Sequence, residues 1–438
     1  MSRKLLDSLY VGALMLYVLA GMASVPFHGD ESTIIYMSHD WYTLFHDPLS
    51  LGYHLDFSGD PHGATDQQLR LANGPLAGYA IGVAWSLVGL SPKDLNDQWL
   101  WGADWDYNQA NGHIPTPALL FVARLSSTLA TAASVAVIFA LARRLANRQA
   151  AWIATFLYGM TPAILLDGRR AMFEGVFLLA SAFLLLAGVW LAGRVARRID
   201  RSRDWLGLGA AAGLALAAKH TALILIVPIF GVLFAAALNM PVFRACAPRR
   251  ETGLAYLWKG MDRIRILNLA LTGFMTAGIF LALNPVWWAR TLEVPAAVLH
   301  WRSELLNGQA AYYGGYHSLA DRAVGMGSAL FGGAQYYEDT HGWPTWIGGQ
   351  IVTYEAAGVA GIPTIVPIAG ILAVPGALLM IRRIRELPMA LFAVVVVVLT
   401  GATFFLTPLL WVRYYLPLMA PLAVLAGLSE GWLHARLA

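Results

Sequence analysis

Long apolar segments are the feature of this 438-residue sequence that most constrains its fold. A helix needs roughly 20 apolar residues to cross the hydrocarbon core of a bilayer, and in lipid its backbone groups must bond within the helix itself. Ten segments meet this requirement alone or in part. They are residues 5–25, 118–142, 150–166, 172–193, 205–218, 221–239, 266–287, 360–381, 388–406 and 413–433. We therefore predict an all-α polytopic membrane protein with a bundle of about ten transmembrane helices.

Composition agrees with this class. The chain is 58% hydrophobic and only 13% charged, about half the charged fraction of an ordinary soluble protein. The fifth and sixth segments form one apolar run that is too long for a single crossing, and we divide it at Lys219 and His220. The first segment has no small-residue cleavage site, so we interpret it as a retained helix and not a signal peptide. The single cysteine, Cys246, excludes an intrachain disulfide.

The distribution of charge predicts which connections lie in the cytoplasm. If the N-terminus is cytoplasmic, every second connection should be rich in Lys and Arg. Those connections and the two chain ends hold 20 of the 30 Lys and Arg, whereas 19 of the 26 Asp and Glu fall on the other side. The basic segments are residues 1–4, 143–148, 194–203, 243–265, 382–385 and 434–438. We therefore expect both termini in the cytoplasm of a cell with a plasma or inner membrane.

Two predicted outer connections are long, residues 26–117 and 288–359, and the inner ones are short. Function should therefore face outward, within a single membrane domain that spans residues 1–438. The first outer loop contains a semi-apolar stretch, residues 71–90, whose Asn-Gly-Pro start is typical of a helix N-terminus. We interpret this stretch as an interfacial or re-entrant helix. The alternative is one or two extra crossings, which would give 11–12 helices.

Ionisable residues gather where the apolar segments meet the predicted outer face. They are Asp30, Glu31, Arg124, Asp167, Arg169, Arg170, Glu174, Lys219 and Arg413. Ionisable residues at membrane depth usually face the bundle interior or a water-filled cavity. Arg and Lys can grip a phosphate, and a carboxylate can take a proton from an attacking hydroxyl. The pattern predicts a pocket for an anionic headgroup beside a general base.

Simpler interpretations exist for several of these residues. Arg170 and Glu174 are four apart on a helix and can pair with each other, and Arg124 and Arg413 can be anchors that reach the interface. Asp30 and Glu31 can cap a helix. Asp104 and Asp106 form a D-x-D pattern that can chelate a divalent cation, although so short a pattern often occurs by chance. Nucleotide-binding and zinc-protease motifs are absent from the sequence.

Several stretches together resemble the GT-C glycosyltransferases, and glycosyltransferase family 39 in particular. That family contains protein O-mannosyltransferases and lipid A aminoarabinose transferases. The similar stretches are "GDES" after the first helix, "NGPLAGYAIG", "ARLSSTLATAASVAVIFALARRL", "LDGRRAMFEG", "GLALAAKHTALILI" and "RYYLPLMAPL". They follow one another in the family's order across almost the whole membrane core. Gly74 stands where the family has a proline, and Glu174 where it more often has Asp.

The resemblance implies an integral membrane transferase with a GT-C-like fold and two outer loops that carry interfacial helices. Its donor would be a sugar on a polyprenyl phosphate, and its acceptor a glycan, lipid or protein, with no nucleic-acid partner. Asp30 would be the general base, acting with inversion at the anomeric carbon. Substrate-binding residues would be Glu31, Arg169, Arg170, Glu174, Lys219, Arg413 and Tyr414. No cofactor would be required, because the lipid phosphate is the activating group, although a divalent metal remains an alternative.

Two other classes of function compete with this one. A glycolipid transporter or flippase would place ionisable residues near the bilayer midplane, on broken helices in two related halves. A non-catalytic membrane assembly subunit would have no need of a charged outer rim. The sequence has no internal repeat and its charges gather at one face, so the transferase is the favoured hypothesis.

Overall fold

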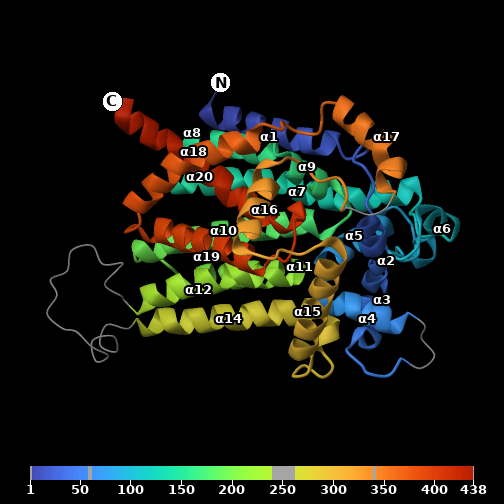
Figure 1. Ribbon diagram of the computed structural model, residues 1–438. Helices are drawn as coiled ribbons and strands as arrows, with labels where there is room; N and C mark the ends of the chain where they lie inside the picture. Colours follow the sequence, from blue (N-terminus) through green and yellow to red (C-terminus); the bar gives the residue numbers. More distant parts are fainter. Residues whose placement is uncertain (1, 58–61, 239–261, 339–341, 438) are drawn as a thin grey trace.

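A computed structural model describes residues 2–57, 62–238, 262–338 and 342–437, and its regular elements in these ranges are all helical. A helix occupies each of the ten predicted segments, and the third segment holds two. The helices are α1 (Arg3–Ala20), α7 (Pro117–Leu145), α8 (Arg148–Gly159), α9 (Pro162–Arg169), α10 (Phe173–Ala196), α11 (Ser202–Ala218), α12 (Leu223–Ala237), α14 (Arg263–Leu283), α18 (Ile365–Arg382), α19 (Leu387–Leu406) and α20 (Leu416–Leu437). Figure 1 shows them as a bundle of roughly parallel rods. The predicted all-α membrane fold is confirmed.

Six helices of the described ranges are long and apolar enough to cross a membrane by themselves. They are α7, α10, the segment His220–Ala237, α14, α18 and α19. The α8–α9 pair meets the same criterion jointly but bends by 61° at its break. That bend has a local cause, because Pro162 begins α9 and the residue before a proline disfavours helical backbone. The chain is therefore an integral membrane protein, and its described ranges hold six helices, or seven if the bent pair is one span, that could cross by length and composition.

The remaining core helices are shorter or more charged. α1 begins with Arg3 and Lys4 and carries Asp7, and α11 has 17 residues. The break predicted at Lys219 and His220 is confirmed. Lys219 has extended backbone, with φ −162° and ψ 130°, and it separates α11 from the short helix η3 (His220–Ala222).

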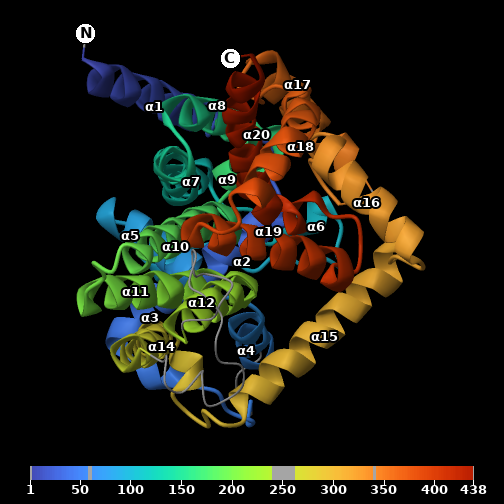
Figure 2. The ribbon, with the colours of Figure 1, turned by 90° about the vertical axis from the view of Figure 1, so that its left-hand side faces the viewer.

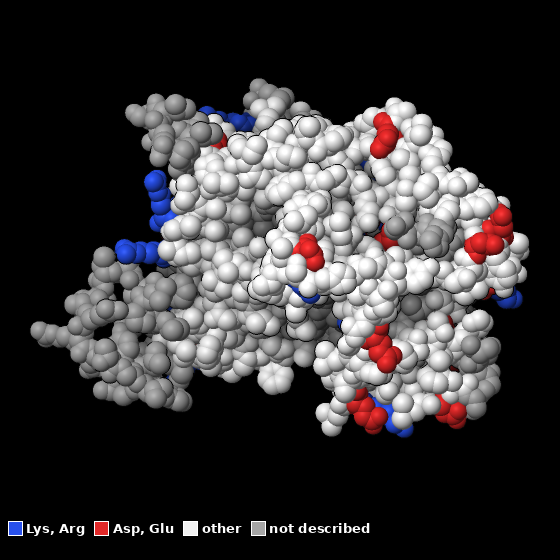
Figure 3. Space-filling view, viewed as in Figure 1, with Lys and Arg blue, Asp and Glu red and all other residues white. Residues whose placement is uncertain are grey.

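The described parts of the predicted basic connections meet at one end of the bundle, which we call the basic end, whereas residues 243–261 lie outside the described ranges. Asp7 of α1 pairs with Arg143 and Arg148 at 3.1 and 2.6 Å. The connection before α11 reaches α14, because Asp200 pairs with Arg265 at 2.9 Å. Figure 1 places both chain termini toward this end, and in Figure 3 exposed Lys and Arg project there while most visible Asp and Glu lie over the opposite half. Alternate connections thus converge as the charge distribution predicts.

The long connections fold into helices at the opposite end, which we call the loop end (Figures 1 and 2). The first contributes α2 (Gly29–Met37), α3 (Asp40–His46), η1 (Pro48–Leu51), α4 (Gly63–Ala72), α5 (Leu76–Leu87), η2 (Pro92–Asp94) and α6 (Trp105–Ala110). The second contributes η5 (Pro285–Trp287), α15 (Val294–Tyr313), α16 (Leu319–Phe331) and α17 (Trp343–Ala356), and η6 (Val412–Tyr414) precedes α20. α15 crosses the outside of this end and contacts α4.

The stretch predicted to be interfacial, residues 71–90, forms the end of α4 and the whole of α5. α5 has 12 residues, which at 1.5 Å per residue cover about 18 Å, too little to cross a bilayer of about 30 Å. The turn between the two helices approaches α11 so closely that a Cβ on Gly74 would collide with the carbonyl of Ala217. This contact explains a glycine where the resembled family has proline. The interfacial placement of α5 stays a prediction.

Candidate functional site

A cavity of about 760 Å³ opens at the loop end between α2, α4, α10 and α15. Its walls include five of the predicted site residues, which are Asp30, Glu174, Lys219, Arg413 and Tyr414. These residues come from α2, α10, the α11–η3 break and η6. Positions up to 384 residues apart in the sequence therefore share one cavity, as the charge distribution predicts.

A second, smaller space of about 230 Å³ adjoins this cavity. More than half of its lining residues are apolar, among them Leu225 of α12, Leu399 of α19 and Pro417 of α20. Four residues line both spaces: Lys219, Arg302, Arg413 and Tyr414. We call the smaller space the apolar groove. The apolar groove and the polar cavity thus meet at three cationic side chains.

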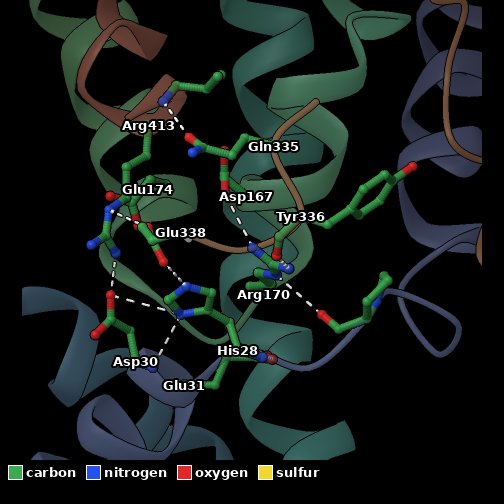
Figure 4. Close-up of polar contacts among 12 residues, drawn as sticks. His28, Asp30, Glu31, Asp167, Arg170, Glu174, Gln335, Tyr336, Glu338 and Arg413 are labelled. Atoms are coloured by element: carbon green, nitrogen blue, oxygen red, sulfur yellow. Dashed lines mark hydrogen bonds and ion pairs between the residues drawn. The ribbon is translucent and has the colours of Figure 1, made fainter. Parts of the chain in front are cut away.

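Asp30 lies in the first turn of α2, where its backbone N–H donates to Nδ1 of His28, the N-cap residue. Its carboxylate forms an ion pair with Arg413, and Arg413 Nε is 3.3 Å from Glu338 Oε1. His28 Nε2 contacts the other oxygen of Glu338 at 2.5 Å (Figure 4). These four residues form a connected cluster in which both acidic side chains have a basic partner. The Arg413 and His28 charges hold the pKa of Glu338 well below its ordinary value, although burial opposes this.

Lys219 Nζ pairs with Glu174 Oε1 at 3.0 Å. The other oxygen of Glu174 is buried without a hydrogen-bond partner in the described residues. The pairing of Glu174 with Arg170, which the i,i+4 spacing allows, does not occur, because Arg170 turns toward Asp167 at 3.6 Å. Glu174 therefore orients Lys219 at the cavity wall and keeps one acceptor free.

Glu31 has a different position from its neighbour Asp30. Its side chain is fully buried, and Arg124 grips it with two hydrogen bonds of 2.7 Å. The backbone N–H groups of Ala171 and His28 donate to the same carboxylate at 2.8 and 3.1 Å. Burial opposes ionisation, but Arg124 holds the pKa of Glu31 below its ordinary value. Glu31 does not line the cavity, and its contacts fix α2 against Arg124 and Ala171.

Arg169 and Arg170 also lie outside the cavity lining. Arg169 is fully buried and donates to the carbonyls of Val18, Tyr17 and Val359 and to the Tyr354 hydroxyl, at 2.6–2.7 Å. Arg170 donates to the carbonyls of Pro26 and Tyr336. The structure therefore does not bring these two arginines into the cavity with the other predicted site residues. Their donors join α1, the α9 end and the second long connection.

The D-x-D pattern forms no site with the other candidates. Asp104 caps α6, accepting from Tyr107 N–H at 2.8 Å, and neither Asp104 nor Asp106 lines the cavity. Among the described residues, no group of three His, Cys, Asp or Glu is arranged to hold a metal ion. Cys246 lies outside the described residues.

Sequence reasoning missed three residues of the site. Arg302 lines both the cavity and the apolar groove, and it forms no ion pair among the residues described. Glu338 and His28 complete the cluster around Arg413 and Asp30. His28 could have been found as the residue before "GDES" in a helix-capping position. Arg302 and Glu338 lie on the second long connection, in stretches without a recognisable motif.

A family model matches part of this chain, and solved structures resemble its fold over nearly the whole chain. Residues 118–247 match the family described as dolichyl-phosphate-mannose-protein mannosyltransferase. No curated protein sequence matches the chain. Among solved structures, ArnT from Cupriavidus metallidurans, bound to undecaprenyl phosphate, is similar with TM-score 0.54 and 15% identity, over 98% of this chain and 61% of that one.

The oligosaccharyltransferase AglB from Archaeoglobus fulgidus, in complex with an inhibitory peptide and a dolichol-phosphate, is also similar. Its TM-score is 0.53 at 12% identity, over 98% of this chain and 51% of that one. The chain thus spans between half and three fifths of the length of these two proteins. At such low identity the likeness concerns the fold. The resemblance to GT-C glycosyltransferases that the sequence motifs suggested is confirmed, and the fold is of that type.

Proposed function

We propose that this protein transfers a sugar from a polyprenyl-phosphate donor to an acceptor hydroxyl, with inversion, at the outer face of a cell membrane. The observation that carries the proposal is the junction of the apolar groove with the polar cavity at Lys219, Arg302 and Arg413. A polyprenyl phosphate has the same division, because an apolar tail ends in an anionic headgroup. Undecaprenyl phosphate in the similar ArnT structure and dolichol-phosphate in AglB support this donor class.

The reaction follows from the positions of the charged groups. The acceptor oxygen attacks the anomeric carbon of the donor sugar, and the Asp30 carboxylate takes the hydroxyl proton. The bond from the anomeric carbon to the phosphate oxygen breaks, and its electron pair leaves on the lipid phosphate. Lys219, Arg302 and Arg413 stabilise the charge that grows there. One displacement inverts the anomeric configuration.

The two competing functions have less support. A transporter needs ionisable groups along its path near the midplane, whereas the charged cluster of this chain lies at the loop end (Figures 1 and 4). An assembly subunit has no use for a cavity with a paired aspartate beside three cations. We also propose that the basic end faces the cytoplasm, which fits the positive-inside rule.

The first test uses the full-length protein in lipid nanodiscs. Undecaprenyl phosphate should raise the melting temperature of the protein, and a radiolabelled sugar on undecaprenyl phosphate should be consumed when membrane extract supplies acceptors. Undecaprenol without its phosphate is the control and should produce a smaller shift. Equal shifts for the two lipids would contradict the phosphate site. A cysteine placed at exposed Leu292, labelled from outside intact cells, tests the orientation.

A further inference from the structure

Besides the three shared cations and four carboxylates, the cavity lining includes aromatic rings and uncharged polar groups. The aromatic residues there include Trp101, Trp301, Tyr312, Tyr313 and Trp411. The amides and hydroxyls include Gln68, Gln98, Gln309, Thr33 and Thr65. A site with large apolar faces and a few well-placed polar groups is the usual design for recognising a small organic molecule.

Two of the aromatic residues connect to the proposed general base through its partners. The Trp101 ring is 5.8 Å from the ring of His28, which accepts from the Asp30 backbone. The Tyr313 ring is 5.3 Å from Trp411, whose own ring lies 4.6 Å from the Arg413 guanidinium carbon. Asp30, Trp101 and Tyr313 line the same cavity, so an acceptor that brings a hydroxyl to Asp30 has both rings within that cavity to pack on.

The charges of the cavity select against an anionic acceptor. All three cations of its described lining also border the apolar groove, where the donor phosphate would occupy them. The other charged lining residues are Asp30, Glu174, Glu304 and Glu338. Each has a basic partner, since Glu304 lies 3.5 Å from His300 and the rest are paired as described above. A second anion would then meet these carboxylates and no unoccupied cation of the described lining.

Two amide side chains of the cavity lining have hydrogen-bonding groups that are not used within the described structure. The side chain of Gln98 forms no hydrogen bond with any described residue, and Gln309 uses only its oxygen, which accepts from the Tyr414 hydroxyl at 2.9 Å. An amide offers both donors and an acceptor, which suits a row of hydroxyl groups. The C–H face of a sugar ring complements the negative face of an aromatic ring.

We propose that the acceptor is a neutral saccharide, whose ring packs on Trp101 and Tyr313 and whose hydroxyls bond to Gln98 and Gln309. This inference rests on the proposed function, because it assumes that the shared cations hold the donor phosphate. It names the substrate class of the same cavity, and it separates a glycan acceptor from a peptide or a phosphorylated lipid.

The test compares three acceptor probes on the full-length protein loaded with undecaprenyl phosphate in nanodiscs. The probes are a panel of neutral linear hexose oligosaccharides, a Ser/Thr-containing peptide and a hexose phosphate. Saturation-transfer NMR should detect the oligosaccharides and favour them over the other two. Trp101→Ala should weaken oligosaccharide binding about tenfold, while undecaprenyl phosphate still raises the melting temperature as in the unchanged protein.

Trp346→Ala is the matched control, because Trp346 stacks on Trp105 in the same aromatic group but does not line the cavity. It should leave oligosaccharide binding unchanged. Undecaprenyl phosphate binding without any oligosaccharide binding, or stronger binding of peptide or hexose phosphate, overturns the inference and leaves the proposed function standing. Trp101-dependent oligosaccharide binding without any sugar transfer from the donor supports the saccharide site and contradicts the proposed function.

Discussion

Arg413 forms an ion pair with Asp30, although 383 residues separate them in the chain. The same guanidinium faces Glu338, so one cation serves two carboxylates at the cavity wall. In the proposed reaction a donor phosphate would compete for Arg413. Asp30 would then exchange part of its pairing for contact with the acceptor hydroxyl, while Glu338 and His28 keep the cluster in place. Arg413 thereby links the proposed base to the proposed site of the leaving phosphate.

Asp30→Asn should lower sugar transfer by about 10²–10⁴-fold, the usual contribution of a general base. Asparagine has nearly the same shape but cannot accept the proton at neutral pH. Because Arg413 keeps Glu338 as a partner, binding of undecaprenyl phosphate should persist. The measurement pairs the transfer rate from a labelled donor with the lipid-induced shift in melting temperature.

Asp106→Asn is the control for this variant, since Asp106 belongs to the same long connection and lies outside the cavity. It should transfer sugar at the normal rate. Full activity of Asp30→Asn would remove Asp30 from the role of base and direct attention to Glu338.

Arg302→Ala should weaken binding of undecaprenyl phosphate by about 10- to 100-fold, the value of a charge-assisted hydrogen bond of 1.5–3 kcal/mol. Arg302 is a cleaner probe than Lys219, whose removal would leave Glu174 buried and unpaired. Because no described carboxylate pairs with Arg302, the melting temperature of the lipid-free variant should stay close to that of the unchanged protein.

Arg290→Ala supplies the comparison, because Arg290 precedes α15 and, among the described residues, its one ion pair is with exposed Glu293 at the surface. Such pairs contribute about 0–1 kcal/mol, and lipid affinity should not change. An Arg302 variant with unaltered affinity would show that the phosphate is held by Lys219 and Arg413 alone.

The fold could be predicted from the sequence because its strongest determinants are local. Apolar length and the polar interruption at Lys219 each act within one or two helical turns. The convergence of the basic connections could be predicted as well, since alternation along the chain fixes which helix ends share a side. Asp7, Arg143 and Arg148 meet for this reason. No comparable sequence rule determines how the two long connections fold against the bundle.

The same distinction separates the site residues that were predicted from those that were missed. Charges beside apolar segments, such as Lys219 and Arg413, are recognisable because their neighbours are hydrophobic. Arg302 lies in a helix of mixed composition, where an arginine is unremarkable until α15 crosses the cavity. Arg169 and Glu31 are predicted site residues that the structure places away from the cavity lining. Both are charges at the predicted face, yet backbone carbonyls and Arg124 occupy them inside the fold.

Arg169→Gln should therefore destabilise the protein without a direct effect on lipid binding. The substitution removes a guanidinium that bonds three backbone carbonyls and Tyr354, and a buried unsatisfied polar group costs about 1–3 kcal/mol. A lowered melting temperature with unchanged affinity for undecaprenyl phosphate is the expected result. This is the reverse of Arg302→Ala, so each variant controls for the other. A large loss of lipid affinity at temperatures where Arg169→Gln is folded would restore the original substrate-binding role.

The Glu31–Arg124 pair predicts a dependence of stability on pH. Removing one partner of a buried ion pair costs about 3–5 kcal/mol, so Glu31→Gln should melt at a markedly lower temperature near neutral pH. The pKa of Glu31 in the folded protein lies below its ordinary value of 4.5. Its stabilising contribution is therefore complete above pH 4.5 and is lost as the pH falls through the folded pKa.

The melting-temperature difference between the unchanged protein and Glu31→Gln should consequently stay constant from about pH 8 to pH 5 and narrow below 4.5. Ile35→Val is the control, because Ile35 is fully buried on the same helix and has no proton to exchange. Its cost of about 0.5–1.5 kcal/mol should be the same at every pH at which the protein folds. A difference for Glu31→Gln that remains constant down to pH 3 would mean that ionisation of Glu31 does not stabilise the folded state, and the fixing of α2 would then depend on its hydrogen bonds alone.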